Sequence, residues 1–299
     1  MLNPKLYVEA YAYLWSWLAD AGDSSGNWSF CGSPIVGYLQ NGQKGNSRAS
    51  NASNALTQYS NKLALATYGG IMNFKTFSYE GYDYIPNSIR RTFMGKASPW
   101  EIQETLQLGS LIGAVSPNNV YRYCIENIGV DCGGFVANYW GISCPHMSNA
   151  APNGWNGISP RTFWVEGIKR RRQSASSIAV GDAAVFFKDM LNDNPDKAKS
   201  RDKGGNLIEG TGSEAFHIGV VSSIEVSGSD ISSLSIAESS GSPSSYGSDG
   251  VNVRAARISG TGKSSSYVHA KAGSNEWIFF VAPPPGAGAE MPYTYGEQE

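Results

Sequence analysis

The segment VDCGGFVANYWG at residues 130–141 places a cysteine where it could act as a nucleophile. Asp131 is suited to cap the helix that FVANYW is expected to form, and this puts Cys132 in the first helical turn. The positive end of the helix dipole favours thiolate, the nucleophilic form. Gly133 and Gly134 would keep the space beside the sulfur open, and amides of the first turn could donate to an oxyanion. The alternative is a buried structural cysteine in a tight turn.

A catalytic cysteine needs a base, and His217 is the best candidate among the three histidines. It lies in an expected strand, EAFHIGVV at residues 214–221, where alternation puts Gly219 on the same face and leaves room for the imidazole to turn toward a partner. His146 lies in a proline-flanked loop and His269 in a Ser/Gly-rich stretch, so we expect both at the surface. The alternative for His217 is a half-buried histidine that serves only the sheet.

Glu238 is the candidate for the group that orients this histidine. It ends the expected strand LSIAE at residues 234–238, on the same face as Leu234 and Ile236. An acidic side chain that shares a face with core residues is costly to bury unless it is paired, and a histidinium is a suitable partner. The alternative is a glutamate at a strand end that reaches solvent.

The elements that would position these side chains predict an α+β protein, because helical patterns come first and strand patterns follow. Helices are expected over residues 4–21, 53–68, 99–115 and 117–128. Ser98 and Glu101 form a capping box at the start of the third helix. Short strands or packed loops are expected within residues 71–95. From residue 178 the expected strands are SIAVGDAAVFF, FHIGVVSSIEV, ISSLSIAES, GVNVRAARI and EWIFFVAP.

Composition limits the classes of protein to consider. The chain has 299 residues, 41% of them hydrophobic, and a net charge of -2, so it can form a sizeable core but offers no strongly basic surface for nucleic acid. No apolar run reaches the roughly 18 residues of a membrane helix. The first 22 residues favour an amphipathic helix over a cleaved signal peptide, because Glu9 interrupts the apolar region and Lys5 is its only basic residue. The basic run at residues 169–172 favours a solvated face, with contact to an anionic ligand as the alternative.

The cysteine pattern argues against a metal site. The four cysteines are Cys31, Cys124, Cys132 and Cys144. They show no CxxC spacing and have no histidine at zinc-finger distance. Four cysteines are too few for a disulfide scaffold, although a Cys31–Cys124 or a Cys124–Cys144 bridge stays open. The acidic residues between 189 and 196 do not follow the EF-hand pattern. We therefore expect neither a metal nor an organic cofactor.

Three of these segments together resemble motifs of the NlpC/P60 cysteine peptidases. DCGGFV at residues 131–136 is similar to their DCSGFV motif, and VGDAAVFF at 180–187 resembles the PGDLVFF strand that precedes their catalytic histidine. FHIGVV at 216–221 resembles their HVGIV strand. The order of cysteine, GD strand, histidine and third polar residue also matches, and the related CHAP amidases commonly carry a glutamate as the third residue. The resemblance covers residues 116–260, whereas residues 1–95 match nothing in these families.

Some positions depart from the family pattern. Gly133 stands where the family usually has serine, and the nearest equivalent of the upstream family tyrosine is Tyr121 or Tyr123. Glu238 stands where many relatives carry His, Asn or Gln. The spacing between cysteine and histidine is longer than in compact members, which predicts inserts in the fold.

The resemblance implies a papain-like fold, in which a helix that carries the cysteine packs on an antiparallel sheet that carries the histidine and its orienting residue. It also implies a cysteine hydrolase that cleaves amide bonds in bacterial peptidoglycan peptides, as an endopeptidase or an amidase. The assigned residues are, as catalytic groups, Cys132, His217 and Glu238, and, as contacts to the stem peptide, Tyr123, Asp131 and Gly133. The chain would then comprise an N-terminal region of unknown role (1–95), a catalytic domain (96–282) and a flexible tail (283–299).

A wall hydrolase must reach the bacterial cell wall, and the sequence leaves other functions open. We expect an extracellular or virion-associated protein that is delivered without a classical signal peptide, as a phage enzyme, an effector of a contractile apparatus or a product of non-classical export. A phage or injection-particle component is favoured, with phage tail or injection-particle proteins as partners. Two alternatives stay open: a non-catalytic structural, baseplate or binding protein on a papain-like scaffold, and an amidase or acyltransferase with a substrate outside the wall.

Overall fold

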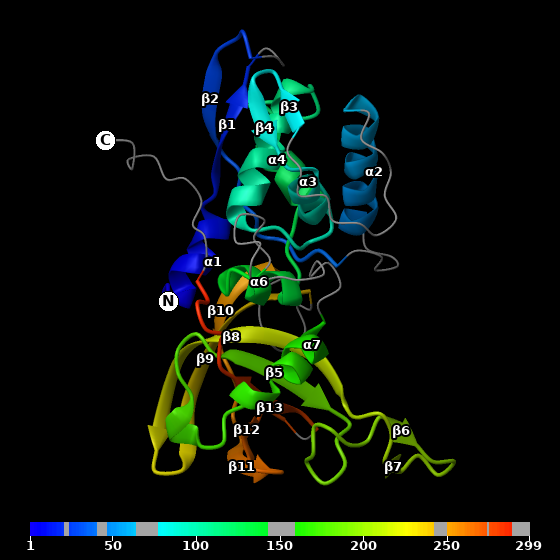
Figure 1. The fold of residues 1–299 in the computed structure, drawn as a ribbon, viewed down its shortest axis with the longest axis vertical. Helices are drawn as coiled ribbons and strands as arrows, with labels where there is room; N and C mark the ends of the chain where they lie inside the picture. Colours follow the sequence, from blue (N-terminus) through cyan, green and yellow to red (C-terminus); the bar gives the residue numbers. More distant parts are fainter. Residues whose placement is uncertain are drawn as a thin grey trace. The chain divides into compact units, whose positions relative to one another are not determined.

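The protein is described by a computed structural model that covers residues 1–20, 24–40, 47–63, 77–142, 159–241, 250–273 and 275–288. The described chain is α+β, and it groups into two compact units (Figure 1). The helical unit comprises Leu6–Asn156, Ser239–Val251 and Ala289–Glu299. The sheet unit comprises Met1–Lys5, Gly157–Glu238 and Asn252–Gly288. This grouping differs from the expected division at residues 95 and 96, which stays a prediction. Most of the expected flexible tail lies outside the described residues.

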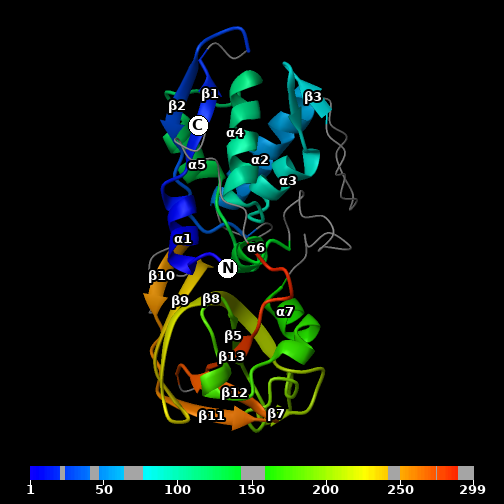
Figure 2. The ribbon, with the colours of Figure 1, turned by 60° about the vertical axis from the view of Figure 1, so that its left-hand side comes forward.

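The helical unit is built from helices and two small hairpins. Its elements are α1 (Pro4–Ala12), β1 (Trp15–Ala19), β2 (Trp28–Gly32), α2 (Ser47–Lys62), β3 (Phe77–Tyr79), β4 (Tyr82–Tyr84), α3 (Pro86–Phe93), α4 (Pro99–Leu111), α5 (Val120–Asn127) and α6 (Cys132–Tyr139). Helix α3 packs on α4, and α2 packs on both α3 and α5. Figure 2 shows α2, α3 and α4 as neighbours in this unit. Strand β1 packs on α4, so the β1–β2 hairpin is attached along that helix.

Aromatic side chains join α1 to α6 inside this unit. Tyr7 and Tyr11 are one helical turn apart, as are Phe135 and Tyr139, so each pair lies on one helix face. The ring of Tyr7 lies 5.5 Å from the rings of both Phe135 and Tyr139. The Tyr11 hydroxyl donates to the carbonyl of Ala97 at 2.9 Å. These contacts hold α6, which begins with the candidate nucleophile, against the N-terminal helix.

The predicted capping box of α4 is confirmed. The Ser98 hydroxyl accepts from the Glu101 amide at 3.2 Å, and the Glu101 carboxylate accepts from the Ser98 amide at 2.7 Å. Pro99 occupies the first helical position, where its missing N–H costs no hydrogen bond. The start of α4 is therefore determined by residues close together in the chain.

The expected helix over residues 4–21 is wrong in its second half. Helix α1 ends at Ala12, and residues 15–19 form strand β1, which pairs antiparallel with β2. Ser16 and Leu18 are buried, whereas Trp15 and Trp17 are exposed. This alternation has the period of a strand, and pairing with β2 outweighs the helical pattern that residues 4–12 begin.

Two further expectations for this unit need correction. Helix α2 begins at Ser47 and ends at Lys62, earlier in the chain than the expected 53–68. Strands β3 and β4 agree with the short strands expected in residues 71–95, but Pro86–Phe93 forms helix α3 there. Pro86 at the start of α3 supports a helix, because its fixed φ suits the first helical position.

The sheet unit follows the predicted order of strands. Its elements are α7 (Pro160–Glu166), short 3-10 turns at Ile168–Arg170 and Ala175–Ser177, β5 (Ala183–Lys188), β6 (Ser200–Arg201), β7 (Leu207–Ile208), β8 (Glu214–Ser227), β9 (Asp230–Ser240), β10 (Gly250–Ala255), β11 (Gly260–Ser264), β12 (Tyr267–Lys271) and β13 (Trp277–Val281). Within the described residues, seven strands form one antiparallel sheet in the order β10-β9-β8-β5-β13-β12-β11. Strands β11 and β12 fall in a Ser/Gly-rich stretch where no strand was expected.

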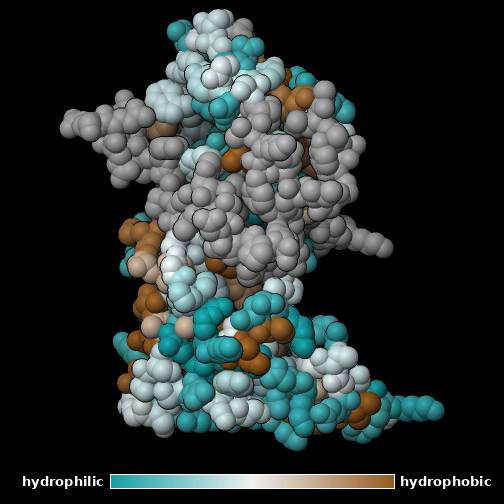
Figure 3. Space-filling view, viewed as in Figure 1, coloured by the Kyte–Doolittle hydropathy of each residue, from teal (hydrophilic) through white to brown (hydrophobic). Residues whose placement is uncertain are grey.

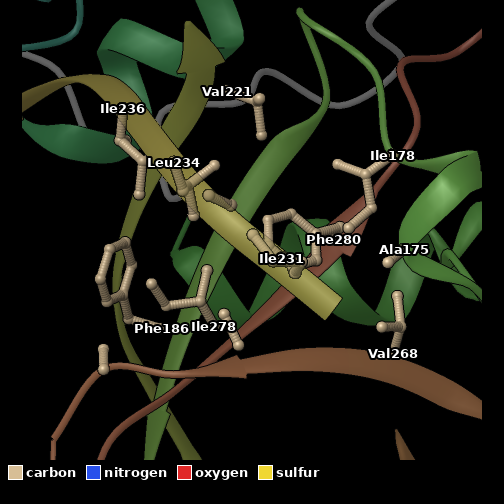
Figure 4. Packing of buried hydrophobic residues seen from close by; sticks show 13 residues of the cluster. Ala175, Ile178, Phe186, Val221, Ile231, Leu234, Ile236, Val268, Ile278 and Phe280 are labelled. Carbon is tan, nitrogen blue, oxygen red and sulfur yellow. The ribbon is translucent and has the colours of Figure 1, made fainter. Parts of the chain in front are cut away.

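One face of this sheet carries a hydrophobic cluster. Its members include Phe186 on β5, Val221 on β8, Ile236 on β9 and Phe280 on β13. Figure 4 shows these side chains gathered over the strands. The amide of Ile231, at the start of β9, donates to the Thr261 hydroxyl of β11 at 2.8 Å, so the sheet curls around the cluster. Side chains on the surface of the sheet unit are mostly hydrophilic on the face seen in Figure 3. None of the helices described here has the length and hydrophobicity of a membrane span.

Candidate functional site

The start of α6 has the local geometry that the sequence predicts. Cys132 is the first helical residue, and it is buried. Asp131 is the N-cap, with extended backbone angles, and its carboxylate accepts from the Gly134 amide at 2.6 Å. The cysteine therefore lies at the positive end of a capped helix, whose first amides have no intrahelical acceptor.

A cation stands beside this cap. The ammonium group of Lys96 forms an ion pair with the second carboxylate oxygen of Asp131. The Asp131 amide donates to the carbonyl of Gly95 at 2.8 Å. Burial raises the pKa of the Asp131 carboxyl, and the Lys96 ion pair and the Gly134 amide counteract this effect only in part. The turn at residues 95–96 thus holds the N-terminus of α6 through both backbone and side-chain contacts.

Gly134 was expected to keep the space beside the Cys132 sulfur open, but its missing side chain matters at another contact. A Cβ at this position would lie 2.6 Å from the carbonyl oxygen of Gly95 and 2.9 Å from the Cα of Lys96. The glycine therefore permits close contact between α6 and the 95–96 turn, rather than space beside the sulfur.

A buried polar network supports the other end of α6. The Arg91 guanidinium donates to Asn138 Oδ1 at 2.8 Å and to Glu101 Oε1 at 2.7 Å. Asn138 Nδ2 in turn donates to the Lys96 carbonyl at 3.0 Å. The network connects α3, α4 and α6, and no sequence pattern signalled it because its members are far apart in the chain.

In the sheet unit, His217 and Glu238 are hydrogen-bonded partners. His217 Nε2 lies 2.8 Å from Glu238 Oε2. The two residues lie on the adjacent strands β8 and β9, whose register pairs Val220 with Ala237. Glu238 is 0% exposed, so the alternative of a strand-end glutamate reaching solvent is wrong. The alternation argument correctly put Glu238 on the face of Ile236, and the register, which pairs Val221 with Ile236, puts His217 on that face as well.

Arg254 on β10 is a third member that sequence reasoning missed. Its Nε donates to Glu238 Oε1 at 2.5 Å, and its Nη2 donates to Glu238 Oε2 at 3.0 Å. Burial alone would raise the pKa of the Glu238 carboxyl, but His217 and then Arg254 outweigh burial and lower it. A buried carboxylate needs a charged partner, so a cationic residue in the expected strand GVNVRAARI was a usable signal.

Gly219 and Phe186 shape the surroundings of the histidine. A Cβ on Gly219 would lie 2.4 Å from Ile236 Cγ2 and 3.1 Å from Glu238 Cβ. The space that glycine leaves is thus used by β9 side chains, whereas we expected it to serve the imidazole. The rings of Phe186 and His217 lie 5.2 Å apart, which packs the imidazole against the hydrophobic cluster.

The candidate nucleophile and the candidate base belong to different units. Cys132 lies in the helical unit, whereas His217 and Glu238 lie in the sheet unit. The pairing of Cys132 with His217 stays a prediction, as do the catalytic roles of all three residues. Tyr123 is on α5, where burial raises the pKa of its hydroxyl well above the usual range. Its substrate contact and those of Asp131 and Gly133 also stay predictions.

His269 is not the surface residue that we expected. It lies on β12, is 5% exposed, and packs its ring 5.2 Å from that of Phe279. Its Nδ1 is buried without a hydrogen-bond partner among the described residues. Burial lowers the pKa of this histidine; Asp193 opposes the shift and Lys271 adds to it. The Ser/Gly-rich sequence around His269 did not predict a strand, but this segment forms β12. His146 lies outside the described residues.

The basic run is also more buried than expected. The Arg171 guanidinium lies 3.6 Å from the centre of the Trp164 ring and 3.1 Å from an Asp196 oxygen. Arg172 donates to both oxygens of Asp182, at 2.8 and 2.7 Å. Two members of the run therefore hold the sheet unit together, and the solvated-face interpretation is wrong for them.

The described thiols and acids provide no sign of a bridge or a metal centre. Among the described cysteines, Cys31 and Cys124 are free thiols rather than bridged to each other, and Cys132 is free as well. Cys144 lies outside the described residues. The described part of the chain contains no group of three or more His, Cys, Asp or Glu side chains arranged to hold a metal ion.

Comparisons of this chain with known protein families, with characterised proteins and with solved structures found no match.

Proposed function

We propose that this chain is a cysteine hydrolase that cleaves amide bonds in the peptides of bacterial peptidoglycan, as an endopeptidase or an amidase on a papain-like scaffold of the NlpC/P60 kind. The observation that carries the proposal is the 2.8 Å contact between His217 Nε2 and the buried carboxylate of Glu238. A histidine oriented by a buried carboxylate is the arrangement that activates serine and cysteine nucleophiles.

Cys132 is the nucleophile in this proposal. Its thiol proton passes to His217, and the sulfur bonds to the substrate carbonyl carbon while the carbonyl electrons move to oxygen. The backbone amide of Cys132, at the N-terminus of α6, donates to this oxyanion. When the tetrahedral intermediate collapses, the C–N bond breaks and His217 returns the proton to the leaving amine, which leaves a thioester.

Water completes the cycle. His217 takes a proton from water as the water oxygen bonds to the thioester carbon. The C–S bond then breaks, the acid product leaves, and the sulfur recovers its proton from His217. One water molecule is consumed, and Cys132 and His217 end in their starting protonation states.

The Glu238 contact determines which imidazole nitrogen does this work. A carboxylate only accepts, so the Nε2 that faces it carries a proton, and Nδ1 is the nitrogen that exchanges protons with sulfur and with the amine. When His217 becomes imidazolium, the Glu238 carboxylate balances its charge. Because the pKa of Glu238 is lowered, this carboxylate stays ionised at neutral pH.

Arg254 is a positioning residue. Its two hydrogen bonds fix the plane of the Glu238 carboxylate, so one oxygen stays aimed at His217. Arg254 does not contact the reacting atoms in this mechanism.

The decisive experiment is a digest of purified peptidoglycan by the full chain and by Cys132→Ala, with products identified by mass spectrometry. We expect fragments from the wild type only, with masses that name the bond. Cys31→Ala is the matched control, because Cys31 is another free thiol of the same unit, and it should behave as wild type. Equal fragments from wild type and Cys132→Ala would rule out Cys132 as nucleophile.

Labelling with iodoacetamide near pH 7 is a second test, which measures the reactivity of the cysteine thiols without any substrate. Burial raises the pKa of the Cys31 thiol, with Asp20 adding to the shift, and burial raises that of Cys124 well above its usual range. Cys132 lies at the N-terminus of α6, which favours thiolate, so we expect it to react before Cys31 and Cys124, as judged by peptide mass spectrometry. An inert Cys132, together with no fragments from several wall types, would overturn the proposal in favour of a non-catalytic scaffold. A reactive Cys132 without fragments would overturn the wall substrate alone.

A further inference from the structure

The β1–β2 hairpin carries a row of aromatic side chains on its outward face. The register pairs Trp15 with Gly32, Trp17 with Phe30 and Ala19 with Trp28. Because side chains alternate along a strand, the aromatic members of these pairs share one face. Trp15, Trp17, Phe30 and Trp28 form what we call the aromatic ladder. Trp15 and Trp17 are 48% and 45% exposed.

The largest apolar side chains of this hairpin lie on its outward face, whereas its inward face is mixed. The inward face carries Ser16 and Leu18, both buried, and the Ser16 hydroxyl bonds to that of Ser33 at 2.8 Å. The β1 backbone is tied to α4, since the Ala19 amide donates to the Ser110 hydroxyl at 2.8 Å. An antiparallel pair normally turns its polar face to water. Large rings on the solvent side add little to folding, and grouped exposed apolar side chains mark contact surfaces.

Three of the rings contact one another, and the fourth contacts Tyr82. Trp15 stacks on Phe30 with centroids 5.2 Å apart and ring planes at 21°, and Trp17 lies 5.0 Å from the same Phe30 ring. The Trp15 ring also lies over Gly32, where an added Cβ would be 3.9 Å from the ring, an ordinary van der Waals distance. At the other end, the half-exposed Tyr82 of β4 packs edge-on against Trp28, 5.5 Å away.

The chemistry of the aromatic ladder indicates the class of ligand that it binds. Neither WSWLA (β1) nor WSFCG (β2) contains a charged residue, so an anionic polymer would find no cation on these strands. Flat rings with an electron-rich face suit the C–H-bearing faces of pyranose sugars, whose hydrogens carry partial positive charge. The uncharged aromatic surface of the ladder is therefore complementary to a neutral oligosaccharide.

We propose that the aromatic ladder binds the glycan strand of the cell wall, and that its sugars are N-acetylhexosamines. The stacking chemistry stands on the ladder alone, whereas the identity of the sugar rests on the proposed function. Bound to the glycan, the helical unit keeps the enzyme on the polymer while the hydrolytic residues act on stem peptides. The ladder is thus a second binding site, distinct from the residues that react.

The test is calorimetric titration of the full chain with soluble oligomers of N-acetylglucosamine and with purified glycan strands. Wild type should bind, and both Trp17→Ala and Trp17→Leu should bind at least about tenfold more weakly. Leucine keeps an apolar side chain but no ring, so it separates stacking from general hydrophobic contact. Leu6→Ala is the matched control, since Leu6 is exposed to a similar degree on α1, outside the ladder.

Three outcomes would overturn the proposal: no binding by wild type to either glycan, full affinity in Trp17→Leu, or a concentration-dependent dimer in light scattering that Trp17→Ala converts to monomer. The last outcome would make the ladder an interface between copies of the chain. Circular dichroism checks that each variant folds. Cys132→Ala should bind sugar as wild type does. If wild type binds sugar but does not cleave peptidoglycan, the proposed function alone is contradicted. If wild type cleaves peptidoglycan but does not bind sugar, the ladder proposal alone is contradicted.

Discussion

Two fully buried glutamates, one in each unit, invite comparison. Glu101 in the helical unit and Glu238 in the sheet unit are both 0% exposed, and both pair with an arginine. Their pKa values nevertheless move in opposite directions. Burial raises the pKa of Glu101 despite Arg91, whereas His217 and Arg254 overcome burial and lower the pKa of Glu238.

The opposite pKa shifts of the two glutamates follow from their different hydrogen-bond partners. One oxygen of Glu101 accepts from Arg91 and the other from the Ser98 amide, which carries no net charge. Glu238 receives two bonds from Arg254 and one contact from His217. Burial alone therefore does not define what a carboxylate does. Glu101 caps a helix and joins α4 to α3, whereas Glu238 is kept anionic beside a histidine.

The largest expected effect comes from removing the Glu238 carboxylate. Glu238→Ala leaves the Arg254 guanidinium buried without this partner, which should lower the free energy of unfolding by about 3–5 kcal/mol. Urea unfolding measures this loss. Glu209→Ala is the control, because Glu209 is an exposed acid whose ion pair with Lys197 lies at the surface. A loss for Glu238→Ala no larger than that of the control would contradict the view that this anion is integral to the sheet unit.

A smaller effect is expected from the glycine that lets β9 approach β8. Gly219→Ala puts a Cβ 2.4 Å from Ile236 Cγ2, and relief of this overlap should cost about 1–3 kcal/mol in unfolding free energy. Gly260→Ala on β11 is the matched control, because no atom lies within 4 Å of its added Cβ. Equal unfolding midpoints for the two variants would show that β9 yields without strain. If Glu238 moves with β9, wall hydrolysis should fall in Gly219→Ala as well.

The smallest effect is a difference in pH dependence between Glu238→Gln and Glu101→Gln. The lowered pKa of Glu238 contributes stability that is present above the ordinary value of 4.5 and is lost as pH falls through the folded pKa. The cost of Glu238→Gln should therefore shrink on acidification. The raised pKa of Glu101 has the opposite sign: this contribution is present below the ordinary value of 4.5 and is lost as pH rises through the folded pKa.

Urea unfolding of wild type and both variants at about pH 7, 5.5 and 4 measures the two slopes. The cost of Glu101→Gln should grow on acidification while that of Glu238→Gln shrinks. Slopes of the same sign would remove the contrast between the two carboxylates. The slopes need no measurement of activity, so they separate the electrostatics of these residues from the proposed function.

Features encoded within a few residues were predictable from the sequence. The capping box of Ser98 and Glu101 depends on residues three apart, and so does the bond from the Gly134 amide to Asp131. Strand alternation likewise predicted that Glu238 shares the face of Ile236 and needs a cationic partner. In each case the determining contacts are local or follow the period of one element.

The amino-acid sequence by itself determined where α4 and α6 begin, the α+β order and the pairing of Glu238 with a histidine. Only the tertiary structure decided that residues 15–19 form a strand, that Arg254 completes the Glu238 site and that His269 is buried. Each of these depends on a partner in another strand: β2 for β1, β9 for Arg254 and β13 for His269. Strand pairing and burial depend on contacts between elements, so local propensity carries little information about them.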